Sequence, residues 1–413
     1  MTHIAWQAGV RFAAAGLILA VVAPDSSVAQ TPFPLGLYTS PGPNGNDRNG
    51  EAAFERDFDN FVKLMGTRPQ FVNAYTDNTQ GDPNKGFVGS AGWMAWSWKR
   101  TGDKYIGPNS GVIPVIGLAM SMPGQDWGNV NEFYVNTLSG QWDRGFRGIV
   151  DQWADNGYKT LYVRISYEFN GTFMAWSPLN AHAPDAVRNF AKAWGHIADL
   201  VHAEGKARGI TVKTVWNPAA MTPNQDNHIA DCYPGDDKVD LVGIDIYSSI
   251  WTPDPAPDWS KSGGQRKIPV KDWIADNANR AHFWQYTNAQ PWQPQPVWNE
   301  GIWGWSFQNM ADFARAHGKP MGVWETGSGN GDKEPPFGPH DDPYFVEWLA
   351  GALTAARASG VTIGPVMLWN DDVWHFTTPG ERPGAAAAWA RYFGREGRRA
   401  AADTQPPPLS AGR

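Results

Sequence analysis

The sequence predicts an α/β protein built as a (β/α)8 barrel, and three observations lead to that prediction. Eight short apolar segments with the composition of buried strands recur along the chain, near residues 37, 72, 115, 163, 214, 243, 323 and 367. Segments with helical spacing separate most of them, which is typical of a parallel sheet covered on both faces. Nearly every predicted strand ends in a polar or aromatic residue, as barrel strands do where they lead into functional loops. A doubly wound open sheet is the second choice.

The predicted elements follow in order along the chain. Strands are expected at Leu35–Thr39, Pro69–Thr76, 112–120, Lys159–Ser166, Val212–Trp216, Val239–Tyr247, Met321–Trp324 and Pro365–Trp369. Helices are expected at Glu51–Met65, Arg144–Ala154, Pro184–Glu204, Phe307–Ala316, Pro343–Ala358 and Ala385–Phe393, with Asp341 or Asp342 capping the helix that begins at Pro343. The cluster Trp93-Met94-Ala95-Trp96-Ser97-Trp98 lies in polar, glycine-rich surroundings, and no helix is predicted there.

The N-terminus has the features of a secretory signal peptide. Arg11 precedes the apolar run Phe12–Ala23, and Ser27-Val28-Ala29 follows as a small-x-small cleavage site. Residues 1–29 are therefore predicted to be the signal, residues 30–395 one barrel domain, and 396–413 a disordered tail. The apolar run is short for a bilayer, so we expect a secreted or periplasmic protein without stable membrane insertion once the signal is removed. An uncleaved anchor is the alternative.

Composition restricts the partners and the kind of core. The net charge is −7 among 413 residues, which gives no indication of nucleic-acid binding. The chain has 23 Trp, and indole rings both fill cores and stack on flat apolar faces such as those of sugars, so we expect some of each. Cys232 is the only cysteine, which excludes an intramolecular disulfide and predicts a small buried side chain.

Two strand ends carry a carboxylate among aromatic residues. The stretch 161–176, LYVRISYEFNGTFMAW, begins as a buried strand and continues into Glu168, flanked by Tyr167 and Phe169. Apolar walls raise the pKa of a glutamic acid towards neutrality, as a catalytic acid requires, although a structural ion pair with Arg164 is an alternative. The stretch 319–327, KPMGVWETG, has the same form and ends at Glu325. Together, the two glutamates fit the paired carboxylates used in glycoside hydrolysis.

Four segments together resemble glycoside hydrolase family 26, the family of many β-mannanases within the clan of retaining (β/α)8 glycoside hydrolases. Arg164-Ile165-Ser166-Tyr167-Glu168-Phe169-Asn170-Gly171, followed by Trp176, is similar to the acid/base segment R-x-x-H-E-x-N-G. The segments Val239–Tyr247 and Pro320–Gly327 resemble the sixth strand and the nucleophile strand, and Trp369 resembles the aromatic residue that ends the eighth strand. The resemblance implies that Glu168 is the general acid/base and Glu325 the nucleophile.

Further residues are expected to bind the substrate. These are Arg164, Tyr167, Asn170, Trp176, Trp216, Asn217, Tyr247 and Trp369. Arg164 and Tyr247 are expected to hydrogen-bond the nucleophile, with a buried structural ion pair as the alternative for Arg164. Neither a cofactor nor a metal is predicted, and we expect a monomer whose partner is a polysaccharide or oligosaccharide.

Tyr167 is the main departure from the family pattern, because the family usually carries histidine there. The phenol either changes the shape and the donors offered to the sugar or replaces the imidazole with similar hydrogen bonding and no change of substrate. The class of β-glycan hydrolase is therefore better supported than any one sugar. We expect β-1,4-mannan, with mixed-linkage glucan, β-1,3-xylan or a bacterial exopolysaccharide as alternatives. A non-catalytic carbohydrate-binding protein on the same barrel is the alternative from another class.

A long tryptophan-rich insert, about residues 250–305, follows the sixth predicted strand. It contains Trp251, Trp259, Trp273, Trp284, Trp292, Trp298, Trp303 and Trp305. A long loop inside a compact domain is usually functional, so a wall or an end cover of a substrate cleft is one hypothesis. A small packed subdomain with buried indoles is the other.

Overall fold

The computed structural model describes residues 33–39, 48–76, 81–122, 124, 126–220, 229–248, 255–283, 305–329, 338–371 and 374–395. The predicted signal peptide and tail, and the insert residues 249–254 and 284–304, lie outside these ranges. Among the described residues, no helix is both long and apolar enough to cross a membrane.

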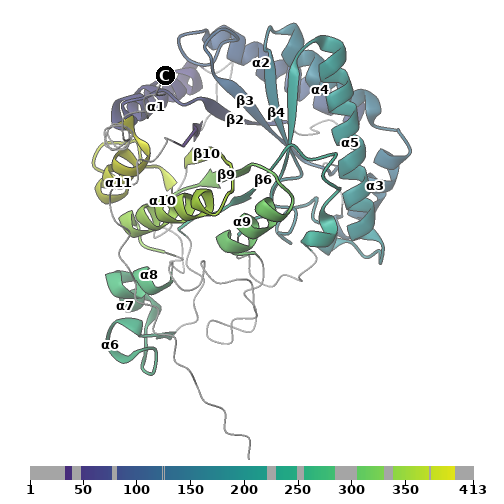
Figure 1. The fold of residues 1–413 in the computed structure, drawn as a ribbon. Helices are drawn as coiled ribbons and strands as arrows, with labels where there is room; N and C mark the ends of the chain where they lie inside the picture. Colours follow the sequence, from purple (N-terminus) through teal and green to yellow (C-terminus); the bar gives the residue numbers. More distant parts are fainter. Residues whose placement is uncertain are drawn as a thin grey trace, which may run out of the picture.

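Eight parallel strands close into a barrel, and Figure 1 shows it surrounded by helices. The strands are β1 (Leu35–Thr39), β2 (Phe71–Thr76), β3 (Ile113–Leu118), β4 (Thr160–Ile165), β5 (Thr211–Trp216), β6 (Leu241–Asp245), β9 (Met321–Thr326) and β10 (Ile363–Asn370). Their order around the barrel is β1-β10-β9-β6-β5-β4-β3-β2, which follows the chain once β7 and β8 are set aside. All eight strands were predicted from the sequence. Because the sheet is closed, the doubly wound open sheet is excluded.

The principal helices are α1 (Arg48–Met65), α2 (Pro83–Thr101), α3 (Val130–Leu138), α4 (Asp143–Asp155), α5 (Ala186–Arg208), α9 (Phe307–Ala316), α10 (Pro343–Ala358) and α11 (Pro383–Phe393). Each of the six predicted helices is confirmed, and Asp342 caps α10 by accepting from Phe345 N at 3.3 Å. The helices α3 and α2 were not predicted, and in α2 glycines interrupt the pattern. Burial of Phe87 and Trp98 and a cap from Asp82 stabilise α2 instead.

Short elements complete the described chain. Three 3-10 turns are η1 (Trp127–Asn129), η2 (Pro178–Asn180) and η3 (Ala230–Cys232). Within the insert, β7 (Ala256–Pro257) pairs with β8 (Lys267–Ile268), followed by α7 (Val270–Ala275) and α8 (Asn277–His282), with α6 (Trp259–Ser262) between the two strands. The insert indoles whose side chains are described, Trp273 and Trp305, are both buried. This part of the insert is therefore packed structure, and its role stays a prediction.

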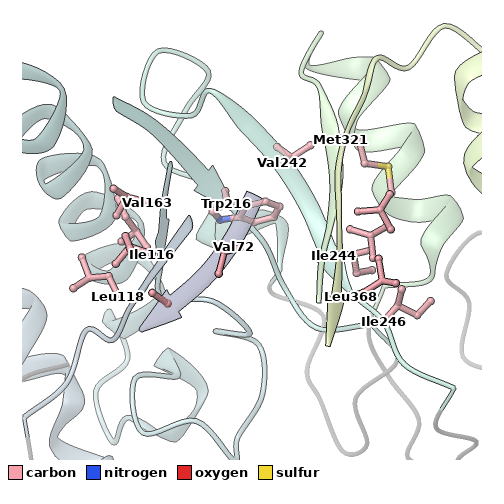
Figure 2. Packing of buried hydrophobic residues seen from close by; sticks show 14 of the residues in the cluster. Val72, Ile116, Leu118, Val163, Trp216, Val242, Ile244, Ile246, Met321 and Leu368 are labelled. Atoms are coloured by element: carbon pink, nitrogen blue, oxygen red, sulfur yellow. The ribbon is translucent and has the colours of Figure 1, made fainter. Parts of the chain in front are cut away.

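Side chains along each strand point alternately to the barrel axis and to the helices, which divides the apolar core into two layers. One side of the strands faces the barrel axis and buries Phe71, Val115, Val215, Leu241, Trp324 and Met367 together. The other side packs against the helices, and Figure 2 shows part of this outer layer, including Val163, Ile244 and Leu368. Because neighbouring strand residues point to opposite faces, the parity of a residue decides which layer it joins.

The indole of Trp324 fits inside the barrel because the strand beside it carries glycine. A Cβ at Gly243 would lie 2.3 Å from the backbone oxygen of Gly322 and 2.3 Å from Trp324 Nε1. Neither neighbour is the end of a flexible chain, so the backbone itself would have to shift. The close approach of β6 and β9 therefore depends on this glycine.

We expect Gly243→Ala to lower the free energy of unfolding by about 1–3 kcal/mol, because the added methyl overpacks the barrel interior. The matched control is Gly351→Ala, at an exposed position of α10 where nothing lies within 4 Å of the added Cβ. That control should raise stability by about 0.5–1 kcal/mol, since alanine favours a helix. Chemical denaturation of the two variants measures both changes, and equal stability would contradict the tight contact.

Candidate active site

Glu325 reaches the barrel axis because β9 contains a bulge. Along β6 and β9, Ile244 pairs with Val323, but the next residue of β6, Asp245, pairs with Glu325. Trp324 is therefore an extra residue on β9 and lies in the inner layer. In a regular strand, Glu325 would point away from that layer. The bulge re-aims it, as bulges beside functional sites commonly do.

Three side chains donate hydrogen bonds to the Glu325 carboxylate. Tyr75 Oη, from β2, donates to Oε1 at 2.7 Å, and Arg164 Nη1, from β4, donates to the same oxygen at 2.8 Å. Tyr247 Oη, just beyond β6, donates to Oε2 at 2.7 Å. Burial, together with the charge of Glu325, raises the pKa of both tyrosines well above the ordinary value, so both keep their protons. Both carboxylate oxygens are thus held in place.

Arg164 connects four strands of the barrel. Its guanidinium is fully buried and uses all three nitrogens: Nε donates to Asn217 Oδ1 at 3.2 Å, Nη1 to Glu325, and Nη2 to Asp245 Oδ2 at 2.6 Å. Asn217 Nδ2 also donates to Asp245 Oδ2, at 2.9 Å. The result is one continuous network from β4 through the ends of β5 and β6 to β9, with the arginine at its centre.

Glu168 lies on the loop that leaves β4, where the backbone is strained. Ser166 and Glu168 both have a φ of 50°, in the left-handed region that non-glycine residues rarely adopt. Two backbone hydrogen bonds hold this turn: Ser166 N donates to Leu118 O at 2.7 Å, and Glu168 N donates to Asn217 O at 3.0 Å. Such strain persists only where the surroundings determine the conformation. Here it places the Glu168 carboxyl beside the network of Arg164.

Three carboxyl groups meet at this point. Glu168, Asp245 and Glu325 each contribute an oxygen, and the three oxygens lie within 4.8 Å of one another. Burial and the charge of Glu325 raise the pKa of Glu168 from 4.5 to about 8, against the opposing effect of Arg164. Burial likewise raises the pKa of Asp245. At neutral pH Glu168 therefore holds a proton, while the Glu325 carboxylate accepts three hydrogen bonds.

The carboxyl cluster also has the spacing of a metal site. It is the one group of this kind among the described residues. Two of its three members already share the Arg164 guanidinium, and Glu168 is a neutral acid near pH 7. A bound cation would compete with a buried arginine, so the arrangement favours proton transfer over metal binding.

Aromatic rings line the rest of the site. Trp369, at the end of β10, stacks on Tyr38 with ring centroids 3.9 Å apart and planes 26° apart. Tyr167 packs edge-on against Tyr75 and Trp176, at centroid distances of 5.2 and 4.8 Å. Trp176 Nε1 donates to Tyr167 O at 2.7 Å, which fixes the two rings relative to each other. Partly exposed rings beside carboxyl groups form a surface on which a sugar ring can stack.

The structure brings most of the predicted site residues together. Seven of them lie at or beyond the carboxyl ends of the strands and are joined by the contacts above: Glu168, Glu325, Arg164, Tyr167, Trp176, Asn217 and Tyr247. Trp369 lies at the end of β10, and its ring centroid is 6.0 Å from that of Tyr75. The functional roles assigned to them remain expectations. The buried ion pair considered for Arg164 is present, and one of its partners is Glu325 itself.

Two residues that were predicted to bind the substrate, Trp216 and Asn170, are instead buried in the protein. Trp216 has no exposed surface, packs on Phe313 at a centroid distance of 5.3 Å, and lies in the outer layer of the core in Figure 2. It precedes Asn217 in sequence, and adjacent strand residues face opposite sides, so both cannot face the barrel axis. Asn170 is also buried: its side chain forms two hydrogen bonds, of 2.9 and 2.7 Å, with the backbone of Ala219. Both residues support the site from behind.

Tyr75 and Asp245 are site residues to which the sequence assigned no role, although they fall near the ends of the predicted strands Pro69–Thr76 and Val239–Tyr247. Strand periodicity carried part of the signal, because Tyr75 shares the parity of Phe71, an inner-layer residue. It could not show that the phenol reaches Glu325, which lies 250 positions away in sequence. Only the closed barrel places β2 and β9 across from each other.

No protein-family model matches this chain. A β-1,3-xylanase from an Alcaligenes species is 24% identical over 187 residues, which are 43% of this chain and 37% of the xylanase. A second, β-1,3-xylanase TXYA from a Vibrio species, is 26% identical over 164 residues, or 37% of this chain and 33% of that protein. The alignments thus span only about a third of each curated relative.

Solved structures resemble the barrel over most of its length. One is a modular family 26 endo-β-1,4-mannanase from Cellulomonas fimi, with a TM-score of 0.51 and 14% sequence identity. The alignment covers 87% of this chain and 70% of the mannanase chain. A double mutant of a C. fimi endo-β-1,4-mannanase has a TM-score of 0.50. The chain resembles the family 26 glycoside hydrolases. At this level of identity the likeness shows the (β/α)8 fold.

We expect Trp216→Ala to lower the free energy of unfolding by about 3–5 kcal/mol, because it leaves a large cavity behind the barrel. Trp127→Ala is the control, since 45% of the Trp127 side chain is exposed. That control should change stability by less than about 0.5 kcal/mol. Denaturation curves for both variants give the two values, and a small effect at Trp216 would contradict its assignment to the core.

Proposed function

We propose that this protein is a secreted or periplasmic retaining β-glycoside hydrolase that cleaves a β-linked polysaccharide. The observation that carries the proposal is the pair Glu168 and Glu325, one carboxyl protonated near neutral pH and the other held by three donors, with oxygens within 4.8 Å. Retaining enzymes place their carboxyl groups about 5–5.5 Å apart, whereas inverting enzymes need about 6.5–9.5 Å to admit water. The short separation favours retention.

In the first step, Glu168 donates its proton to the glycosidic oxygen while a Glu325 oxygen attacks the anomeric carbon. The C–O bond to the leaving sugar breaks, and a covalent glycosyl ester on Glu325 forms. Tyr247 and Tyr75 orient the attacking carboxylate, and Arg164 supports the same oxygen as Tyr75. Because these donors are already in place, the nucleophile needs little reorganisation on the way to the transition state.

In the second step, the roles of Glu168 reverse. Its carboxylate accepts a proton from a water molecule, the water oxygen attacks the anomeric carbon, and the ester on Glu325 is released. Two displacements restore the original anomeric configuration. The pKa of Glu168 suits both roles, because loss of the Glu325 charge in the ester removes one of the two causes of its elevation.

The identity of the polymer depends in part on Tyr167, which lies beside the two catalytic glutamates. Its ring occupies space left by glycine on β3: a Cβ at Gly117 would lie 2.4 Å from Tyr75 and 3.0 Å from Tyr167. Burial raises the pKa of Tyr167, so the phenol keeps its proton and offers one donor to a sugar hydroxyl. On the family resemblance, β-1,4-mannan is the first candidate.

The second candidate polymer is β-1,3-xylan. The two curated relatives found by sequence are both β-1,3-xylanases, at 24% and 26% identity, whereas the mannanase structures share 14% or similar identity with this chain. This similarity in sequence makes β-1,3-xylan the alternative polymer.

A carbohydrate-binding protein without activity is less well supported. Binding alone requires no protonated Glu168, no bulge at Glu325 and no buried arginine network, each of which costs free energy of folding. Their combined presence favours catalysis.

We expect wild type to release reducing sugar from at least one of β-1,4-mannan, galactomannan, β-1,3-xylan, mixed-linkage glucan and cellulose. The Glu325→Ala variant should lose at least about 10⁴-fold in kcat, as enzymes do when the nucleophile is removed. Anomeric configuration followed by NMR during the first turnovers should show retention.

The control for that experiment is Asp341→Ala. Asp341 caps α11 through Gly384 N and Ala385 N, outside the site, so this variant should keep activity. Absence of sugar release from every polymer, with the folded wild type verified, would contradict the proposal, and an inverted product would contradict the mechanism.

We expect kcat/KM to fall as the pH rises through about 8. Glu168 must carry a proton to act as acid, and it loses that proton above its pKa, so activity should drop about tenfold per pH unit beyond that point. Removing the Glu325 charge in Glu325→Gln should lower the Glu168 pKa, measured by NMR titration of the carboxyl carbon. An alkaline limit that does not involve Glu168, or an unchanged pKa in the variant, would contradict this assignment.

A further inference from the structure

Two exposed tryptophans lie side by side on α2, away from the site described above. Trp93 and Trp96 each have 42% of their surface exposed, and their ring centroids are 5.5 Å apart with planes tilted by 36°. The spacing of three residues places them on the same face of the helix. Trp98 on the same helix is buried against Trp153, so α2 uses one indole for the core and presents the other two outward.

Two polar side chains lie near this pair of rings, which we call the Trp93–Trp96 platform. The guanidinium of Arg100 lies over the Trp96 ring, 5.6 Å from its centroid. The side-chain amide of Gln152, from α4, lies beside Gly92, where a Cβ would be 2.6 Å from Gln152 Oε1. Flat rings bordered by hydrogen-bonding groups match the surface of a sugar, which has apolar C–H faces and a rim of hydroxyls.

The platform is remote from Glu168 and Glu325. The helix α2 starts after the carboxyl end of β2, near the site, and runs back along the outside of the barrel (Figure 1). Trp93 is ten residues beyond Pro83, which corresponds to about 15 Å along the helix axis. A ligand on the platform therefore does not occupy the catalytic carboxyls.

We propose that the Trp93–Trp96 platform is a second, non-catalytic binding surface for the polysaccharide substrate. The identity of the ligand rests on the proposed function, whereas the binding surface is inferred from the exposed rings alone. Two neighbouring indoles stack on sugar units of one chain, and Arg100 and Gln152 hydrogen-bond their hydroxyls. Such a surface holds the enzyme on a long or insoluble polymer between cleavage events, which raises the local concentration of substrate.

Charge argues against a second copy of this chain as the occupant. No Asp or Glu occurs between Pro83 and Thr101, and Lys99 and Arg100 are exposed next to Trp96. A symmetric dimer through this face would set those cations against their own copies, which is unfavourable. A neutral glycan has no such repulsion to overcome.

The test measures binding of the chain to insoluble β-1,4-mannan and β-1,3-xylan by depletion from solution. Binding is measured in the Glu325→Ala background, so that the polymer is not consumed. We expect Trp93→Ala with Trp96→Ala to bind roughly tenfold more weakly, since each lost stacking contact weakens affinity a few-fold. Replacing both tryptophans by phenylalanine should restore most of the binding, and Leu138→Ala, which removes an exposed apolar side chain on α3, should bind normally.

With Glu325 intact, the double alanine variant should keep its kcat on short soluble oligosaccharides and lose rate on insoluble polymer. Unchanged polymer binding in that variant overturns the proposal. So does wild-type self-association in sedimentation, or binding to anionic phospholipid vesicles, if either is abolished by the double variant while glycan binding persists. Weakened glycan binding in a chain that releases no sugar upholds the platform and overturns the hydrolase.

Discussion

The buried guanidinium of Arg164 is the interaction on which the site depends. A fully buried charge is expensive unless each of its donors is paired, and here the three nitrogens reach Asn217, Glu325 and Asp245. Those partners come from different strands, so the charge is compensated only when the barrel is closed in the correct register. The network thereby couples folding to the assembly of the active site: a chain that satisfies Arg164 also brings Glu325 to its place.

The same network separates the properties of two chemically identical side chains. Glu325 accepts hydrogen bonds from an arginine and two tyrosines, whereas Glu168 is held near that charge on a strained turn and its pKa is raised to about 8. Their surroundings alone thus give the two glutamates different hydrogen-bond partners and keep a proton on Glu168 near neutral pH. The strain at Ser166 and Glu168 and the bulge before Glu325 are departures from regular geometry, and both aim a carboxyl at the same point.

The many tryptophans serve distinct purposes that depend on the face they occupy. Trp324 fills the barrel interior, Trp216 fills the layer behind it, and Trp369 borders the site. Trp93 and Trp96 are turned outward on α2. Composition alone indicates an abundance of aromatic surface but does not assign any ring to one of these places, since burial of an indole depends on which elements pack against it.

The sequence by itself determined the eight strands, most of the helices and the two glutamates, because apolar periodicity and strand-end position are local properties of the chain. It did not separate Trp216 from Asn217, because both lie at the same strand end and only the parity set by the closed barrel turns one to the axis and the other to the helices. Nor did it predict α2, whose glycines weaken its pattern until packing against α4 stabilises it. The contact of Tyr75 with Glu325, and the pKa that Glu168 acquires beside it, were decided by tertiary structure, since they require strands distant in sequence to meet across one small, poorly hydrated space.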